Sequence, residues 1–291
     1  MSFDLHHPAT LAEAIDLAGR LGPAARFIAG GTDLVIQINR KKTAPAHLID
    51  ISRLPGLSGI IETADGYALG PLTTYRTIEL HPAFRGPLSA LVEAAAVVGG
   101  HQVRNIATIG GNIVNASPAA DFVPPLLTLD ATLDLTGPRG SRAVALQDFM
   151  VGPGKTALGA GEMVTAIRFG RLAENSATAF LKEGRRRAME ISVVCVAACL
   201  TLDASGTRCV VARLAVGAAG PKTLRPERAE AFLADRAAEP SSFRAAGQLA
   251  AEASAPISDV RASADYRRHL VGVLVERALT RCVERISGAR P

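Results

Sequence analysis

The stretch Arg26-Phe-Ile-Ala-Gly-Gly-Thr-Asp-Leu34 joins a short apolar segment to a pair of adjacent glycines. Its first four residues have the composition of a β-strand, and the apolar residues after Asp33 are compatible with a helix. Glycine lets a backbone approach a ligand closely and turn its N–H groups toward phosphate oxygens, and a helix that begins directly afterwards adds its own free N–H groups. We therefore expect a diphosphate site here, with Asp33 presenting its backbone because its carboxylate would repel a phosphate. The candidate residues are Ala29, Gly30, Gly31, Thr32, Asp33 and Leu34.

A second pair of adjacent glycines lies in Thr108-Ile-Gly-Gly-Asn112, again between polar residues. A side chain at Gly110 is expected to fill the space of the anion. Taken singly, each pair is explained better by a tight turn, since the chain has 27 glycines. The Rossmann spacing is absent. Gly152-Pro-Gly-Lys-Thr156 is no P-loop, because its leading glycine spacing is wrong and Pro153 removes an N–H group. The candidate residues are Thr108, Ile109, Gly110, Gly111 and Asn112.

The rest of the chain predicts an α+β protein with more than one domain. Thr10 and Glu13 form a capping box at the start of a helix. A helix over 88–98 ends at Gly99-Gly100, where glycine supplies a left-handed cap. The β-rich runs 191–202 and 209–216 predict a hairpin, and Ala-rich helices follow to about residue 286. We expect domains at 1–172, with subdomains of about 1–55 and 56–172, and at 173–291.

Composition narrows the classes of function. The net charge is +5. Arg185-Arg186-Arg187 is the one arginine run and aromatic residues make up 4%, which argues against a nucleic-acid-binding protein. The positive charge suits an anionic ligand or an acidic partner at least as well. No apolar run reaches the roughly 18 residues of a membrane span and no secretion signal precedes the first strand, so the expected compartment is the cytoplasm. None of the four cysteines forms a close pair, so we interpret them as core residues and expect no metal site. No catalytic constellation is recognisable, so any redox chemistry requires a bound cofactor.

An ordered set of motifs resembles one family over nearly the whole chain, the FAD-binding medium subunits of the molybdenum hydroxylases, of the carbon monoxide dehydrogenase and xanthine dehydrogenase type. The motifs are the two glycine segments, the second extended to Gln102, together with Ala116-Ser-Pro-Ala-Ala-Asp121, Pro124-Pro-Leu-Leu127, Asp148-Phe149, Lys155-Thr156, Gly161-Glu162, Lys182, Arg186-Arg187 and Ser258-Asp-Val-Arg-Ala-Ser-Ala-Asp-Tyr-Arg-Arg268. Each motif alone is common, whereas their order is specific to the family.

The resemblance implies a two-subdomain, non-Rossmann FAD-binding fold of the PCMH type, followed by a smaller α+β domain with an antiparallel sheet and helices. Both glycine segments would hold the pyrophosphate of FAD, Asp121 would lie near its ribose or phosphate end, and Val164 would also contact the cofactor. Lys182 would lie near the isoalloxazine, where a cation stabilises the anionic reduced flavin. From the residues alone, Lys182 is better explained as a solvated lysine in a basic stretch, and the resemblance reverses that preference. The resemblance assigns no catalytic residue and no metal ligand to this chain.

The resemblance also implies partners. Electrons would pass from molybdopterin in a large subunit through a small [2Fe-2S] subunit to FAD, and from there to NAD, a quinone or another acceptor, in a dimer of heterotrimers that is cytoplasmic or peripheral at the inner membrane face. The alternative is a stand-alone FAD-dependent oxidoreductase of related fold. The chain departs from some relatives at Val98, where they place an aromatic ring, and lacks their cysteine-rich [4Fe-4S] insertion. It also has Glu190 where aspartate is more usual.

Overall fold

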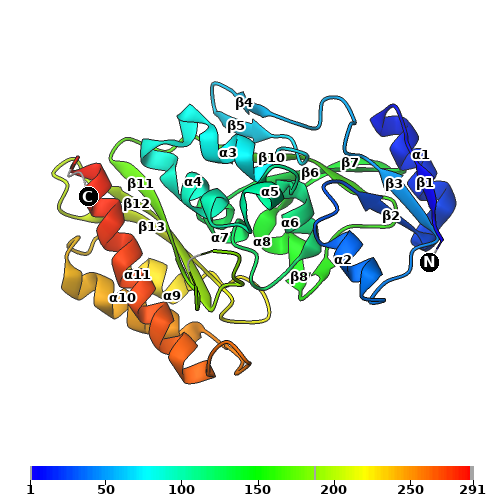
Figure 1. Ribbon diagram of the computed structural model, residues 1–291. Coiled ribbons are helices and arrows are strands. Elements are labelled where there is room, and N and C mark those ends of the chain that lie inside the picture. Colours follow the sequence, from blue (N-terminus) through cyan, green and yellow to red (C-terminus); the bar gives the residue numbers. More distant parts are fainter. Residues whose placement is uncertain (1, 187, 289–291) are drawn as a thin grey trace.

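Three parallel strands form the first sheet, with β3 between β1 and β2. The computed structural model describes residues 2–186 and 188–288, so Met1, Arg187 of the arginine run and residues 289–291 of the expected last domain lie outside the described residues. Figure 1 shows this sheet at the opposite end of the molecule from the C-terminal helices. The elements are β1 (Asp4–His6), α1 (Leu11–Leu21), β2 (Ala25–Ile28), α2 (Leu34–Asn39) and β3 (His47–Asp50).

The start of α1 confirms the predicted capping box, with one difference. Thr10 Oγ1 accepts a hydrogen bond from the backbone N–H of Glu13 at 3.1 Å. The Glu13 carboxylate accepts from the N–H of Ala9 at 2.7 Å, one residue earlier than the usual box places it. Both bonds satisfy donors that would otherwise be free at the entry to the helix.

An antiparallel sheet of order β4-β5-β10-β6-β7 forms the second layer. Short helices cover it and enclose the largest apolar core. The elements are β4 (Ile60–Glu62), β5 (Gly66–Leu69), α3 (Tyr75–Leu80), α4 (Ser89–Ala96), α5 (His101–Arg104), α6 (Ile109–Asn115), α7 (Val123–Thr128), β6 (Thr132–Gly137), β7 (Gly140–Ala145), α8 (Leu146–Phe149), β8 (Met150–Gly152), β9 (Lys155–Thr156) and β10 (Met163–Gly170). Glu162, one of the family motifs, is a structural residue here: its carboxylate accepts from Arg142 at 2.7 Å.

The predicted hairpin is confirmed as β12 and β13, which pair antiparallel with β11 on the other side of β12. Helix α11 packs on β11 and β12, whereas α4 and α7 pack from the other direction. The elements are β11 (Ser176–Glu183), β12 (Val194–Leu202), β13 (Cys209–Gly217), α9 (Glu227–Leu233), α10 (Pro240–Ala253) and α11 (Ala264–Ile286). The α+β class with an antiparallel C-terminal sheet is therefore confirmed.

The sequence of β12 is apolar without interruption because both faces of this sheet are buried against other parts of the protein. Cys195 and Ala197 belong to the core of the second layer, whereas Val196 and Ala198 belong to the core under α10 and α11. The other cysteines are also buried and free, which confirms their interpretation as core residues. The proposed boundary between residues 172 and 173 lies between β10 and β11, and it crosses a shared apolar core.

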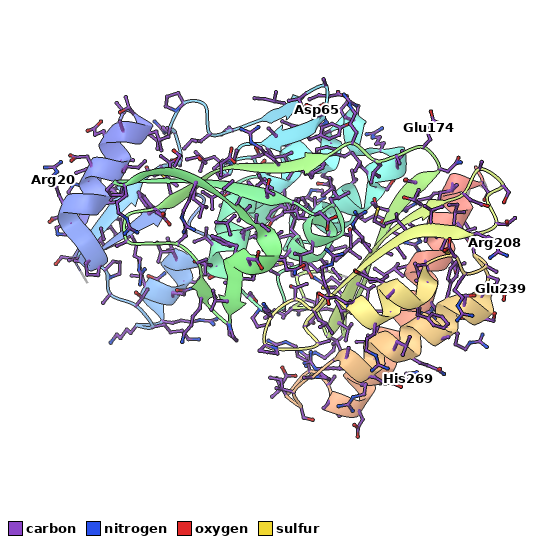
Figure 2. All side chains as sticks on the ribbon, turned by 180° about the vertical axis from the view of Figure 1, so that it is seen from behind. Arg20, Asp65, Glu174, Arg208, Glu239 and His269 are labelled. Atoms are coloured by element: carbon purple, nitrogen blue, oxygen red, sulfur yellow. The ribbon has the colours of Figure 1, made fainter. Side chains whose placement is uncertain are left out.

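The helix that precedes Gly99 is shorter than the sequence predicted. The helix expected over 88–98 is α4, which ends at Ala96, and Gly99 adopts the left-handed conformation expected of it, with φ of 53°. Charged residues such as Arg20, Asp65, Arg208 and His269 lie at the periphery (Figure 2). Within the described ranges, no helix has both the length and the apolar character needed to span a membrane.

Candidate functional site

The first glycine segment connects β2 to α2 and lies directly against the second. A Cβ atom at Gly30 would come within 1.9 Å of the carbonyl oxygen of Ile106, so only glycine allows the two backbones this close. Gly31 has φ of +69°, a left-handed conformation that other residues rarely adopt. The structure therefore brings together two segments that are separated by about eighty residues in the sequence.

The first segment presents a row of unbonded backbone donors. Among the described residues, no acceptor lies within hydrogen-bonding distance of the N–H groups of Gly31, Thr32, Asp33 and Leu34. The side chain of Asp33 makes no capping bond to α2. Partial burial raises the pKa of Asp33. Successive N–H groups of this kind bind phosphate oxygens.

The second glycine pair differs from the prediction, because it lies inside the first turn of α6 and its N–H groups are already bonded. Gly110 N–H donates to the carbonyl oxygen of Pro71 at 2.8 Å, and Gly111 N–H donates to Thr108 Oγ1 at 3.2 Å. These N–H groups are therefore already bonded within the protein, and a contact between this pair and a phosphate stays a prediction. Gly111 is exposed, and a Cβ there would meet only Thr108 Oγ1 at 3.1 Å, so this glycine offers a bare surface to a ligand.

Two polar atoms near this surface are buried without a partner among the described residues. They are Asn112 Oδ1, on the turn that holds the glycines, and the hydroxyl of Tyr75. Buried polar groups are almost always hydrogen-bonded, so unpartnered ones mark where a ligand fits. Together with the free N–H groups, they fit a ligand that carries both phosphate and hydroxyl groups, as FAD does. Sequence reasoning missed Tyr75, because a lone tyrosine at the start of a helix forms no pattern.

Asp121 and Lys182 form a buried ion pair. Lys182 Nζ lies 2.6 Å from Asp121 Oδ2, and each side chain is 10% exposed. The ammonium also donates to the carbonyl oxygen of Glu190 at 2.8 Å, and Ser192 Oγ donates to the other Asp121 oxygen. Burial raises the pKa of Asp121, while Lys182 opposes that shift. The resemblance placed these residues at different parts of the cofactor, whereas the structure places them in direct contact.

Val164 belongs to the largest apolar core, which also contains Ile109 and Tyr75. It sits on β10, pairs in register with Leu135 of β6 and is 3% exposed. No described contact joins its side chain to the glycine segments or to the ion pair. Its contact with a cofactor stays a prediction.

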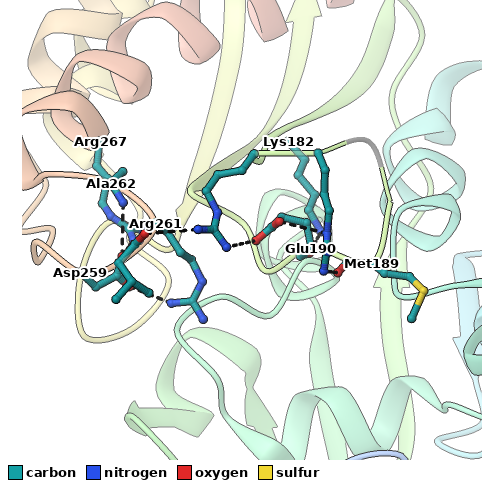
Figure 3. A network of polar contacts seen from close by, with 10 residues as sticks. Lys182, Met189, Glu190, Asp259, Arg261, Ala262 and Arg267 are labelled. Carbon is teal, nitrogen blue, oxygen red and sulfur yellow. Dashed lines mark hydrogen bonds and ion pairs between the residues drawn. The ribbon is translucent and has the colours of Figure 1, made fainter.

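The connection between β11 and β12 is held by an ion-pair network beside Lys182 (Figure 3). Glu190, to which the sequence assigned no role, is 6% exposed as a side chain and pairs with Arg186 at 3.2 Å and with Arg185 at 3.6 Å. Arg185 also donates to the carbonyl oxygen of Val260 at 3.3 Å. The longer glutamate side chain thus anchors the segment that carries the backbone carbonyl bonded to Lys182.

Asp259 is the acidic centre of the second half of this network. It pairs with Arg267 at 2.7 Å and with Arg261 at 2.8 Å (Figure 3). Arg267 is buried and donates to the carbonyl oxygen of Val193 at 2.6 Å, so the network ties the 258–263 segment to the start of β12. Asp259 and Arg267 belong to the last of the family motifs, and their role in the structure is to join elements.

We expect Asp259→Asn to change the pH dependence of stability. The hydrogen bond from the Arg261 N–H and the pairing with Arg267 lower the pKa of Asp259 from 3.8 to about 2. A lowered acid pKa stabilises the fold above the unfolded pKa, and that contribution is lost as the pH falls through the folded pKa. Thermal melts should therefore show a lower Tm for the variant at pH 6, with a gap that narrows toward pH 2. Asp65→Asn, at an exposed site, serves as the control, and a gap that is constant with pH would contradict the role of Asp259.

No group of three or more potential metal ligands occurs among the described histidine, cysteine, aspartate and glutamate residues. The chemistry that the arrangement supports is binding: free backbone donors for a diphosphate, a glycine surface beside them, and a buried lysine–aspartate pair.

Comparisons with known proteins agree over the full length. Residues 1–171 match the family described as the FAD binding domain in molybdopterin dehydrogenase, and residues 179–282 match the CO dehydrogenase flavoprotein C-terminal domain. The chain is 35% identical to the xanthine dehydrogenase FAD-binding subunit of Escherichia coli O157:H7, over 97% of each chain, and 32% identical to the carbon monoxide dehydrogenase medium chain of Afipia carboxidovorans, over 98% of each. The solved structure of reconstituted CO dehydrogenase from Oligotropha carboxidovorans superposes with a TM-score of 0.94 at 32% identity, over 98% of this chain and 99% of that one. The chain belongs to the FAD-binding subunits of the molybdenum hydroxylases, the oxidoreductase family of the carbon monoxide and xanthine dehydrogenases.

Proposed function

We propose that this chain holds FAD against the first glycine segment and relays electrons from a [2Fe-2S] subunit to an acceptor such as NAD or a quinone. The observation that carries the proposal is the row of free N–H groups at residues 31–34, on a segment whose Gly30 packs against the backbone of Ile106, just before the second glycine pair. A diphosphate bound there would satisfy several donors at once.

The other site residues would contact different parts of the cofactor. Residues 29–34 hold the pyrophosphate, Gly111 permits its close approach, and Asn112 offers its amide to a polar group of the cofactor. FAD, when bound, supplies the capacity to take up and release electrons. Lys182 contributes a positive charge that favours an electron-rich ligand nearby, and Asp121 fixes the position of that charge.

The partners follow from the names of the relatives, which are medium chains or FAD-binding subunits of larger enzymes. We infer a large molybdopterin subunit that oxidises the substrate and a small [2Fe-2S] subunit that delivers its electrons, assembled as a dimer of heterotrimers. The complex is assigned to the cytoplasm or to the inner face of the membrane as a peripheral protein. In this arrangement the chain does not select the substrate.

The test is purification of the chain with whatever binds it, followed by analysis of cofactors. We expect close to one FAD per chain, together with molybdenum and iron in two further subunits, and reduction of the FAD by substrate only in the complex. The full chain alone should bind FAD and be reduced by dithionite, but not by an organic substrate. Substrate-dependent reduction of the isolated chain would instead favour a stand-alone FAD-dependent oxidoreductase.

A further inference from the structure

Tyr75 is a buried residue whose backbone contacts the segment that leads into the second glycine pair. It is the first residue of α3 and is 1% exposed. Its backbone N–H donates to the carbonyl oxygen of Ala107 at 3.2 Å, and the preceding Thr74 bridges to Thr108, the residue that caps the turn with the glycines. Its ring packs edge-to-face against Phe122, at 5.5 Å between ring centres, and Phe122 directly follows Asp121. The orientation of Tyr75 is therefore set from both sides of the candidate site.

The hydroxyl of Tyr75 makes no hydrogen bond to any described residue. It is buried, and no hydrogen-bond partner lies within reach among residues 2–186 and 188–288. An unpartnered buried hydroxyl costs free energy that a phenylalanine at the same place would not cost. A core position with no use for the oxygen is better filled by phenylalanine, as at the neighbouring Phe122.

The surroundings of the Tyr75 hydroxyl determine its protonation state. Burial, together with the negative charges of Asp121 and Asp33, raises the pKa of Tyr75 well above its usual value. Tyr75 therefore stays protonated and can donate a hydrogen bond, but it cannot exchange its proton with a reacting group. Its backbone N–H donates to Ala107, whose backbone nitrogen lies against Gly30, and its ring packs on Phe122, next to Asp121. Tyr75 therefore lies between the first glycine segment and the Asp121–Lys182 pair.

We propose that the Tyr75 hydroxyl donates a hydrogen bond to FAD, at the ribityl chain that links the diphosphate to the flavin ring. The inference rests on the proposed position of FAD, with the diphosphate at residues 31–34 and the ring near Lys182. A donor between these two places meets the part of the cofactor that carries hydroxyl oxygens as acceptors. Tyr75 is thus a positioning residue, held by α3 and Phe122 so that its hydroxyl is already in place when the cofactor binds.

The test compares Tyr75→Phe with Tyr67→Phe, a matched control in the same core whose ring packs on Phe84 and Phe169. In the full chain freed of FAD, Tyr75→Phe should raise Tm by roughly two to four degrees, because it removes an unpartnered buried hydroxyl. The same variant should bind FAD roughly three- to tenfold more weakly, measured by quenching of flavin fluorescence, because one hydrogen bond is lost. Tyr67→Phe should leave the FAD dissociation constant unchanged.

Ligands that contain only part of FAD show which part accepts the hydrogen bond from Tyr75. Riboflavin 5′-phosphate keeps the ribityl chain and should lose affinity by the same factor as FAD, whereas ADP keeps the diphosphate and should bind both proteins equally. A loss with ADP would move the hydrogen bond to the pyrophosphate and overturn the ribityl assignment. An unchanged FAD dissociation constant, or a fall in Tm without FAD, would overturn the proposal for Tyr75. Failure of the unaltered chain to bind FAD would instead count against the proposed position of FAD and its role.

Discussion

Gly111→Val is expected to give a folded chain that binds no FAD, whereas Gly110→Val is expected to cost the fold itself. Both glycines lie in the first turn of α6, but their surroundings are opposite. A Cβ at Gly110 would lie 2.6 Å from Pro71 Cβ and 2.7 Å from its carbonyl oxygen, in a buried contact where the backbone has no room to move. We expect a loss of about 3 kcal/mol or more in the free energy of unfolding, at the upper end for an overpacked core.

At Gly111 the conflict is smaller, because the one close contact of an added Cβ is with a side-chain oxygen, Thr108 Oγ1 at 3.1 Å. The residue is exposed, its φ is ordinary for a helix, and the atom nearest to an added Cβ belongs to its own capping residue, Thr108. Valine is a slightly better helix former than glycine, so stability should change by less than about 0.5 kcal/mol. The added methyl groups then occupy the exposed surface at Gly111, where the proposed position of FAD needs room for the cofactor.

Urea unfolding measures the loss of stability in each variant, and the ratio of FAD to protein measures the loss of cofactor binding. Gly111→Ala serves as the smaller step and should weaken FAD binding without loss of fold. Stoichiometric FAD in folded Gly111→Val would remove this glycine from the site. A stable Gly110→Val that lacks FAD would show that Gly110 faces the ligand, as the sequence suggested.

The contrast between these glycines shows what the sequence could and could not predict. Each pair is two adjacent glycines followed by a polar residue, Thr32 in one and Asn112 in the other, so a pattern treats them alike. What separates Gly110 from Gly111 is Pro71, and what makes Gly30 obligatory is the carbonyl of Ile106. Contacts of this kind join distant parts of the chain, and no local propensity describes them.

Local features were predictable because their causes are local. The hairpin of β12 and β13 follows from two β-rich runs and a turn, and Gly99 has the predicted left-handed conformation, although α4 itself already ends at Ala96. The pairing of Asp121 with Lys182 joins residues 61 positions apart and was not predicted, even though both were expected in the site. The free hydroxyl of Tyr75 is visible only once its surroundings are known.

The second large effect is expected from Lys182→Met, which removes the cation from the buried pair. The Asp121 carboxylate would then remain buried with neutral donors such as the Ser192 hydroxyl and no cation beside it. Breaking a buried ion pair by removing one partner costs about 3–5 kcal/mol, because the remaining charge is uncompensated. The double variant Lys182→Met with Asp121→Asn should recover most of that loss, since it leaves no buried charge. The exposed Lys42→Met is the matched control and should change stability little.

The pH dependence of Lys182→Met identifies Asp121 as the cause. Burial already raises the pKa of Asp121 above its ordinary 3.8, and removal of Lys182 takes away the group that opposes this shift. A raised acid pKa destabilises the fold above the folded pKa, and the penalty disappears as the pH falls below the unfolded value, because the carboxyl group is then neutral in both states. The loss in Tm should therefore be largest at neutral pH and shrink toward pH 4, whereas the double variant should follow the unaltered chain more closely. A loss that is equal at all pH values would assign the effect to the missing packing of the lysine side chain, and Asp121 would then not need its partner to remain buried.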